Sequence, residues 1–308
     1  MNGCLISVRN LMKTYRIGDV AVRALRGGRC RNSSGRRKDA GVPGVARRTH
    51  MKLRAAARLA CAPVLAAVAA CGGSGSPTSP SQAPLPVTAE SLSFRYHYAT
   101  GDSVDANWQE TYHAWATTKL GVHLPQKIEY YKYQTRQTMG DHTGNYSTNG
   151  FAEPSRFEIH TLWPTDNHEV VHIYTSLVGR PSDFFNEGIA VALQTDPAAG
   201  NFESVFNGQQ VHQACQQYLQ LGTLVVPLDR VVQTSDFRGI SDQVLSYREA
   251  GSFVRFAIDS YGIGRLLEFF RVSGRDDNLA TIKQRFSTAV GVSMEAAEAA
   301  WMEMLTAR

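Results

Sequence analysis

Cysteine and long apolar runs are both scarce in this sequence of 308 residues. Of its 5 cysteines only Cys215 lies beyond residue 71, so no intrachain disulfide is available to the C-terminal part of the chain. We expect Cys215 to be a small buried residue rather than a nucleophile. The apolar run at 59–70 has 12 residues, whereas a transmembrane helix needs about 20. This run is therefore too short to cross a bilayer as a stable helix.

Acidic side chains are almost missing from the start of the chain. The whole sequence has a net charge of +5, but residues 1–50 hold 12 basic and only 2 acidic side chains. Residues 71–308 hold 17 basic and 25 acidic side chains, a net charge of −8. Because nucleic-acid binding needs clustered lysine and arginine, we expect no nucleic-acid partner for this larger part.

Residues 51–70 have the organisation of a secretory signal peptide, with a cationic stretch at 51–58 before the apolar run. The run ends in Val68-Ala69-Ala70-Cys71, which resembles the lipobox of bacterial lipoproteins. That resemblance implies a lipidated Cys71, a membrane anchor and an extracytoplasmic place in the bacterial cell envelope. Residues 71–90 are rich in Gly, Ser and Pro, which is typical of a flexible tether. The alternatives are an ordinary signal peptide cleaved nearby or a hydrophobic core helix.

Residues 5–27 resemble the opening strand pair of an ABC-transporter ATPase subunit. That family continues into a phosphate-binding loop of the form GxxxxGK[ST], and the sequence contains no such loop. A nucleotide-driven transport function is therefore excluded for the mature chain. We predict that residues 1–50 are an extension and that translation starts at Met51.

The hydrophobic pattern of residues 91–306 predicts an α+β domain, because strands come first and helices follow. It predicts a small antiparallel or mixed sheet with one helix, a pair of helices, and then a mainly helical C-terminal part. Asp102 or Ser103 is expected to cap the first helix, Gly121 to end it, and residues 276–278 to cap a later one. The expected strands are 91–98, 127–134 and 156–162, with a loop at 139–150. The expected helices are 104–120, 165–178, 183–194, 205–221, 243–260, 262–272, 279–289 and 293–306.

The segment His168-Glu169-Val170-Val171-His172 is an HExxH motif. On a helix, residues i and i+4 lie on one face, so both imidazoles can reach the same point. That is the geometry of two zinc ligands. Glu169 follows the first histidine, where its carboxylate can take a proton from water held by the metal. The alternative is a helix with two solvent-exposed histidines.

A third ligand is available on the next expected helix. Gly179-Arg180-Pro181 ends the motif helix, and Glu187 then lies where it can face the histidines across a tight turn. Two histidines and one carboxylate, with a fourth position left for water, form a catalytic zinc arrangement.

The order HExxH, short connection, Phe185-Asn186-Glu187-Gly188-Ile189-Ala190 is similar to that of gluzincin metallopeptidases. It resembles in particular the small peptidase-MA-like domains of bacterial envelope proteins. The resemblance implies that residues 91–306 form a zincin-like zinc metallopeptidase domain acting on peptides or proteins. It also implies that His168, His172 and Glu187 bind Zn²⁺ and that Glu169 is the general base. The strand at 156–162 would be the sheet edge to which an extended peptide adds.

The sequence departs from that family one turn beyond the third ligand. Thermolysin-like relatives often have an Asp there, which holds a metal-bound imidazole, whereas this chain has Val191. Asp166, Asp183 and Asn186 are the alternatives for that supporting role.

Other polar residues offer further candidates for catalysis. Tyr247 is the candidate to stabilise the oxyanion of the transition state, and packing of this ring on the core is an equally good interpretation. His160 and His212 are weaker candidates. A different class of function, a non-catalytic envelope binding or assembly lipoprotein with the same fold, is also compatible with the motifs. The intact Glu169 favours the enzyme, because a purely structural site has no need of the base.

Overall fold

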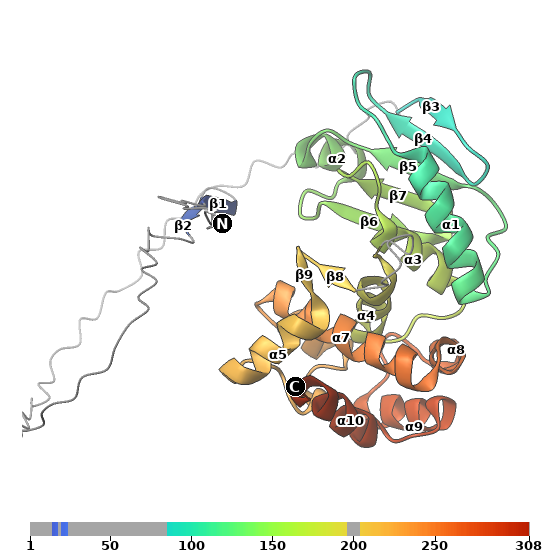
Figure 1. Cartoon of the computed structure of the whole chain (residues 1–308). Helices are drawn as coiled ribbons and strands as arrows, with labels where there is room; N and C mark the ends of the chain where they lie inside the picture. Colours follow the sequence, from blue (N-terminus) through green and yellow to red (C-terminus); the bar gives the residue numbers. More distant parts are fainter. Residues whose placement is uncertain (1–13, 18–19, 24–84, 196–203, 308) are drawn as a thin grey trace, which may run out of the picture. The chain divides into compact units, whose positions relative to one another are not determined.

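The computed structural model describes residues 14–17, 20–23, 85–195 and 204–307 (Figure 1). The chain divides into two compact units, Met1–Cys71 and Gly72–Arg308. In the first unit β1 (Thr14–Ile17) and β2 (Val20–Arg23) pair antiparallel. The predicted signal peptide and Cys71 lie outside the described residues. Within the described ranges, no helix combines the length and the apolar character that crossing a bilayer requires.

The second unit is an α+β domain with a mixed five-stranded sheet, as predicted. The sheet has the order β3-β4-β5-β7-β6. Its three inner strands run parallel, and the outer strands β3 and β6 are antiparallel to their neighbours. The strand bounds are β3 (Val87–Glu90), β4 (Phe94–Tyr98), β5 (Ile128–Lys132), β6 (Gly150–Glu153) and β7 (Glu158–Thr161).

Helices make up most of the chain after the sheet, in agreement with the prediction. A small hairpin, β8 (Val205–Phe206) and β9 (Gln209–Gln210), interrupts them. The helices are α1 (Ala106–Leu120), α2 (Arg136–Thr143), α3 (Asn167–Ser176), α4 (Asp183–Leu193), α5 (Val211–Leu221), α6 (Thr234–Gly239), α7 (Gln243–Tyr261), α8 (Ile263–Val272), α9 (Leu279–Val290) and α10 (Met294–Thr306). Single 3₁₀ turns lie at Pro154–Arg156 and Leu228–Arg230.

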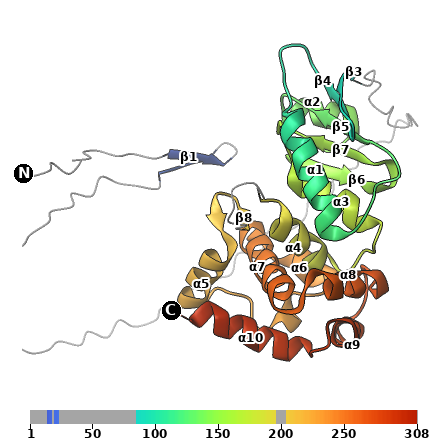
Figure 2. The same ribbon diagram turned by 45° about the vertical axis from the view of Figure 1, so that its right-hand side comes forward.

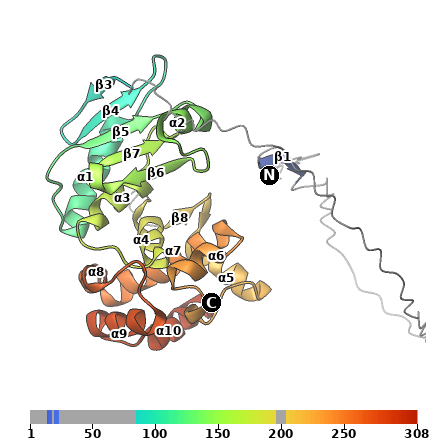
Figure 3. The same cartoon turned by 180° about the vertical axis from the view of Figure 1, so that it is seen from behind.

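The two faces of the sheet have different side chains because residues alternate along each strand. Helix α1 crosses one face, in front of the sheet in Figure 2 and behind it in Figure 3. The side chains buried on that face are apolar or aromatic: Phe94, Tyr96, Tyr130 and Ile159. The opposite face has a row of stacked rings from four neighbouring strands: His97, Tyr131, His160 and Phe151.

Helices α4 and α7 approach each other closely in the helical part of the domain. A Cβ atom at Gly188 would lie 2.8 Å from the carbonyl oxygen of Ala250, and one at Gly251 would lie 2.3 Å from a methyl group of Val191. Only glycine fits at both positions, since real Cβ contacts are longer. This contact fixes the backbone of α4 beside Glu187.

Several local predictions were wrong, each for a physical reason. Residues 139–143, predicted as the start of a loop, belong to α2, which Thr135 and Thr138 begin with a reciprocal capping box. Helix α1 begins two residues later than expected, because Asp105 rather than Asp102 or Ser103 caps it. Residues 87–90, assigned to the tether, pair with β4 as β3. Strand β7 is not a sheet edge, since it pairs with β5 and β6 on its two sides.

Other local predictions are confirmed. Gly121 ends α1 in the left-handed conformation, and Asn278 caps α9. Cys215 is completely buried. Helix α5 begins at Val211 rather than at residue 205, because the preceding residues form the β8-β9 hairpin.

Candidate functional site

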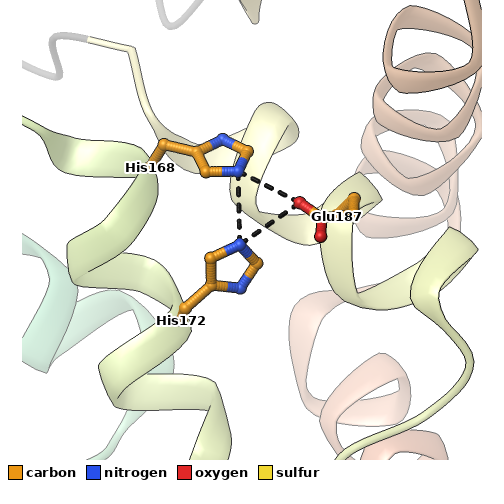
Figure 4. Close-up of side chains that lie close together, drawn as sticks. All are labelled: His168, His172 and Glu187. Atoms are coloured by element: carbon orange, nitrogen blue, oxygen red, sulfur yellow. Dashed lines mark hydrogen bonds and ion pairs between the residues drawn. The ribbon is translucent and has the colours of Figure 1, made fainter. Parts of the chain in front are cut away.

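Helices α3 and α4 bring the three predicted metal ligands together. His168 and His172 project from one face of α3 toward the carboxylate of Glu187 on α4 (Figure 4). Oε2 of Glu187 lies 3.2 Å from Nε2 of His168 and 3.3 Å from Nε2 of His172. The two Nε2 atoms are 3.2 Å apart. One atom from each residue can therefore contact a single ion, and we name these three residues the cleft group.

The local sequence explains why the motif forms a helix with this orientation. Asp166 caps α3 by accepting a hydrogen bond from the backbone of Glu169. Its other oxygen accepts a bond of 2.7 Å from the hydroxyl of Thr161, which ties the cap to β7. Val170 and Ile173 are completely buried on the far side of the helix. Both histidines are thereby left facing the cleft.

The cleft group lies in a cavity of about 940 Å³. The cavity wall combines the edge strand β6, helices α3, α4 and α7, and the hairpin β8-β9. Its polar and charged lining residues include Asp166, His168, Glu169, His172, Arg180, Asp183, Asn186, Glu187, Gln194, Arg238, Tyr247 and Arg275. All of the predicted site residues therefore lie around one hollow, except Cys71, which is outside the described residues.

Gln194, the C-cap residue of α4, orients the first histidine. Its Oε1 lies 2.8 Å from Nδ1 of His168, and its amide nitrogen donates to the carbonyl of Val205. Since that donation fixes the amide, the oxygen accepts a hydrogen bond from the N–H group at Nδ1. When this imidazole is neutral, Nε2 of His168 is therefore the unprotonated nitrogen, and it faces Glu187 and His172.

Asn186 is next to the second histidine. Its amide nitrogen lies 3.3 Å from Nδ1 of His172. Of the three supporting residues that the sequence offered, Asn186 is the one that contacts an imidazole. Asp166 caps α3 instead. Asp183 contacts neither imidazole and is connected to Glu187 through Arg238, which donates to both carboxylates.

Arg238 of α6 connects Glu187 to the surrounding structure. It donates to Oε1 of Glu187 at 2.7 Å and to Asp183 at 2.6 Å. A second arginine, Arg275, donates to both oxygens of Asp183. Arg238 thus occupies one oxygen of Glu187 and leaves the other directed at the histidines.

Charges around the cleft group change its protonation equilibria. Burial lowers the pKa of His168, but the hydrogen bond to Glu187 and the negative charges of Glu169 and Asp166 outweigh burial and raise it to about 9. Burial alone would raise the pKa of Glu187, yet the two histidines hold it well below its usual range. The site therefore favours positive charge at the point where these side chains meet.

Glu169 faces the cavity beside the cleft group and is buried. Burial and the charge of Asp166 raise its pKa to about 7, although the nearby histidines oppose this. Gly150, at the start of β6, packs directly on these two carboxylates. A Cβ atom there would lie 2.7 Å from Oδ2 of Asp166, so the close approach requires glycine.

Tyr247 lies on α7 at the cavity wall and also packs against neighbouring aromatic rings. Its ring stacks on Phe206, with 5.3 Å between ring centroids, and its hydroxyl accepts a hydrogen bond of 3.1 Å from Arg238. Burial raises the pKa of Tyr247, so the hydroxyl keeps its proton. Arginine has no hydrogen-bond acceptor, so Arg238 does not use this proton, and the hydroxyl can still donate a hydrogen bond.

The two weaker histidine candidates lie elsewhere. His212 on α5 is hydrogen-bonded to Ser252. His160 is buried in β7 and belongs to a second set of potential ligands with Glu153 and Glu158, which we name the sheet group. Arg156 forms ion pairs with both carboxylates of the sheet group, at 2.8 and 3.4 Å, and so neutralises much of their charge.

No protein family model matches the chain, and no curated protein or solved structure matches it either. The site must therefore be interpreted from its own geometry. Sequence reasoning missed Gln194 and Arg238. Gln194 could have been found, because it lies seven residues after Glu187 and so on the same helical face. Arg238 carries no such signal, since 51 residues separate it from Glu187.

Proposed function

We propose that this chain is a zinc-dependent metallopeptidase whose site is built by α3 and α4. The observation that carries the proposal is the convergence of the cleft group in a large cavity beside the buried carboxylate of Glu169. Any one of these features alone would be weaker support, because ligand groups and cavities are each common.

The residues present fit a zinc ion. Two imidazole nitrogens and one carboxylate oxygen are ligands that zinc prefers, and three protein ligands leave a position open for a reactant. Because Gln194 holds the proton on Nδ1 of His168, Nε2 is the nitrogen that binds a cation, which replaces the proton there. His168, His172 and Glu187 would hold the ion.

The chemistry that zinc supplies in such a site is Lewis acidity, which polarises a carbonyl and lowers the pKa of water. Glu169 accepts the proton of the attacking water and passes it to the leaving amine. A pKa near 7 suits both transfers at neutral pH. Tyr247 donates a hydrogen bond to the developing oxyanion, while Arg238 holds its hydroxyl in place.

The edge strand β6 replaces the strand at 156–162 as the place where a peptide would bind. Strand β6 pairs with β7 on one side only, and Gly150, Phe151 and Ala152 line the cavity. An extended peptide adding to the free side of β6 would pass the cleft group. Backbone hydrogen bonds would supply much of its affinity.

We further propose that the protein is anchored in the bacterial cell envelope through a lipid on Cys71. The support is the sequence of residues 51–71, whose cationic, apolar and lipobox segments follow in the order of a lipoprotein signal. Metabolic labelling with a radioactive fatty acid should label the chain, and Cys71→Ser should abolish the label. Labelling that survives this substitution would contradict the anchor.

Glu169→Gln tests the catalytic proposal. The variant should keep a full equivalent of zinc, because Glu169 is not a ligand, and should lose about 10²- to 10⁴-fold in kcat on a peptide substrate. Metal analysis and a peptidase assay with a chelator control measure the two effects. Stoichiometric zinc without any peptide hydrolysis by the unmodified chain would instead favour the non-catalytic binding lipoprotein.

A further inference from the structure

The two ends of the cleft differ in charge. Helix α4 runs from Asp183 to its C-cap Gln194, with Glu187 between them, and all three residues line the cavity. At about 1.5 Å of rise per residue, the two ends of this helix are some 16 Å apart. The Gln194 end is lined by uncharged residues of the hairpin, including Phe206 and Asn207.

The Asp183 end has an excess of positive charge. We name Arg180, Arg238 and Arg275, which all line the cavity there, the arginine cluster. Two buried carboxylates receive hydrogen bonds from these guanidinium groups: Asp183 from Arg238 and Arg275, and Glu187 from Arg238. With both carboxylates counted, the arginine cluster keeps one positive charge, and Arg180 pairs with neither carboxylate.

The cations face solvent while the anion lies behind them. The side chain of Asp183 is 3% exposed, whereas those of Arg238 and Arg275 are 40% and 41% exposed. A solute that enters this end of the cleft therefore meets guanidinium groups first. The buried carboxylate orients these groups, so less conformational entropy is lost when they bind.

Hydrogen-bond donors remain available in the arginine cluster. Arg275 uses Nε and Nη2 on Asp183, and within residues 85–195 and 204–307 its Nη1 makes no hydrogen bond. In those same ranges Arg180, an exposed residue, makes neither a hydrogen bond nor an ion pair. A planar carboxylate is the anion of peptides that the guanidinium fork binds in a bidentate manner.

We propose that the arginine cluster binds a carboxylate of the substrate, either an acidic side chain or a free C-terminal carboxylate. This inference rests on the proposed peptidase function, because it assigns the substrate class of the same cleft. Asp183 lies one helical turn, about 6 Å, from Glu187, and Arg180 lies further out. An extended peptide advances about 3.3 Å per residue, so the carboxylate belongs two or three residues from the scissile bond.

Matched fluorogenic peptides test the proposal on the full chain loaded with zinc. One series has Asp or Asn at each of the three positions on both sides of the bond, and another ends in a carboxylate or an amide. The acidic member of one pair should be cleaved with a kcat/KM about tenfold higher or more, as a charged hydrogen bond predicts. The pair that shows the difference identifies the side chain or the terminus as the source of the carboxylate.

Arg180→Glu should abolish or reverse this preference, and raised salt should weaken it. Arg271→Glu is the matched control. Arg271 is also exposed, at 59% of its side chain, but it lies on α8 outside the cavity lining. The Arg271→Glu variant should prefer the acidic peptide as strongly as the unmodified chain does. Cleavage with no acidic preference, or a preference unchanged in Arg180→Glu, would overturn the arginine cluster as a carboxylate site and leave the peptidase proposal standing.

The same peptides separate the two proposals if nothing is cleaved. Fluorescence anisotropy then measures binding of each labelled pair to the full chain and to Arg180→Glu. Tighter binding of the acidic peptide, lost in Arg180→Glu, would support the carboxylate site and contradict the peptidase. Equal binding of both members would contradict the carboxylate site as well.

Discussion

The cleft group and the sheet group have similar ligands at similar spacing, yet their surroundings shift the pKa of a histidine in opposite directions. In both, one ligand atom from each of three residues lies within 4.8 Å of the others. The pKa of His168 in the cleft is raised to about 9 by neighbouring carboxylates that outweigh burial. The pKa of His160 in the sheet is lowered to about 3 by burial and by the nearby cationic groups of His142 and Arg156.

From this difference we expect a cation at the cleft group and none at the sheet group, although the ligand spacing is similar. A field that attracts a proton to an imidazole also attracts a metal ion, and a field that repels the proton repels the ion. The surroundings of the ring nitrogens also differ. In both groups Nε2 of the histidine faces a carboxylate of the same group, Glu158 for His160 and Glu187 for His168. Only in the cleft group does a second imidazole, that of His172, meet this point, with its Nε2 3.2 Å from Nε2 of His168.

Removing one histidine from each group gives the largest expected contrast. His168→Ala should reduce bound zinc from about one equivalent to nearly none and abolish peptidase activity, because two ligands rarely retain a catalytic ion. His160→Ala should keep both zinc and activity. Metal analysis of the two purified variants, with circular dichroism to verify folding, makes the comparison.

The opposite result would reverse the assignment of the two groups. If His160→Ala lost zinc and His168→Ala retained it, the sheet group would be the metal site. The proposed mechanism through Glu169 would then have no basis.

A smaller effect on zinc binding is expected when Gln194, which orients the imidazole of His168, is replaced. Gln194→Ala should weaken zinc binding by about 10- to 100-fold, because Nδ1 of His168 loses the acceptor that selects its tautomer. Competition with a chelator measures the affinity. Gln213→Ala, at an exposed position on α5, is the control and should bind zinc as the unmodified chain does. An equal affinity in both variants would show that Gln194 does not position the ligand.

The smallest effect concerns stability and the sheet group. The unfolded chain binds a proton at His160 below about pH 6.5, while the folded chain does not until about pH 3. This histidine therefore costs stability as the pH falls below 6.5, by up to about 2 kcal/mol at pH 5. In His160→Phe the free energy of unfolding should fall less between pH 7 and pH 5, as measured with urea.

Loss of the hydrogen bond to Tyr133 in His160→Phe adds an offset that does not vary with pH, so the slope is the informative quantity. A slope equal to that of the unmodified chain would mean that His160 is not held neutral in the fold.

Helical periodicity explains most of what could be predicted from the sequence. The i, i+4 spacing of His168 and His172 depends only on the geometry of one helix, and the turn before α4 brings Glu187 within reach. These local relations placed the three side chains correctly. The mixed sheet and the helical C-terminal part followed from the order of the patterns.

Non-local pairing explains what could not be predicted. Whether β7 is an edge depends on β6, whose short segment at 150–153 lies beside the glycine- and asparagine-rich stretch and has no alternating pattern of its own. The contact of Arg238 with Glu187 joins residues far apart in the chain, and no periodicity connects them. Both features arise from the packing of whole elements, which composition and spacing do not encode.

The close contact between α4 and α7 at Gly188 and Gly251 limits how the site could evolve. Glu187 and Tyr247 are carried by these two helices, so a larger side chain at either glycine would displace a ligand and a hydroxyl together. Variants with new substrate preferences are therefore expected in the β8-β9 hairpin and in β6 beyond Gly150, rather than where α4 and α7 touch.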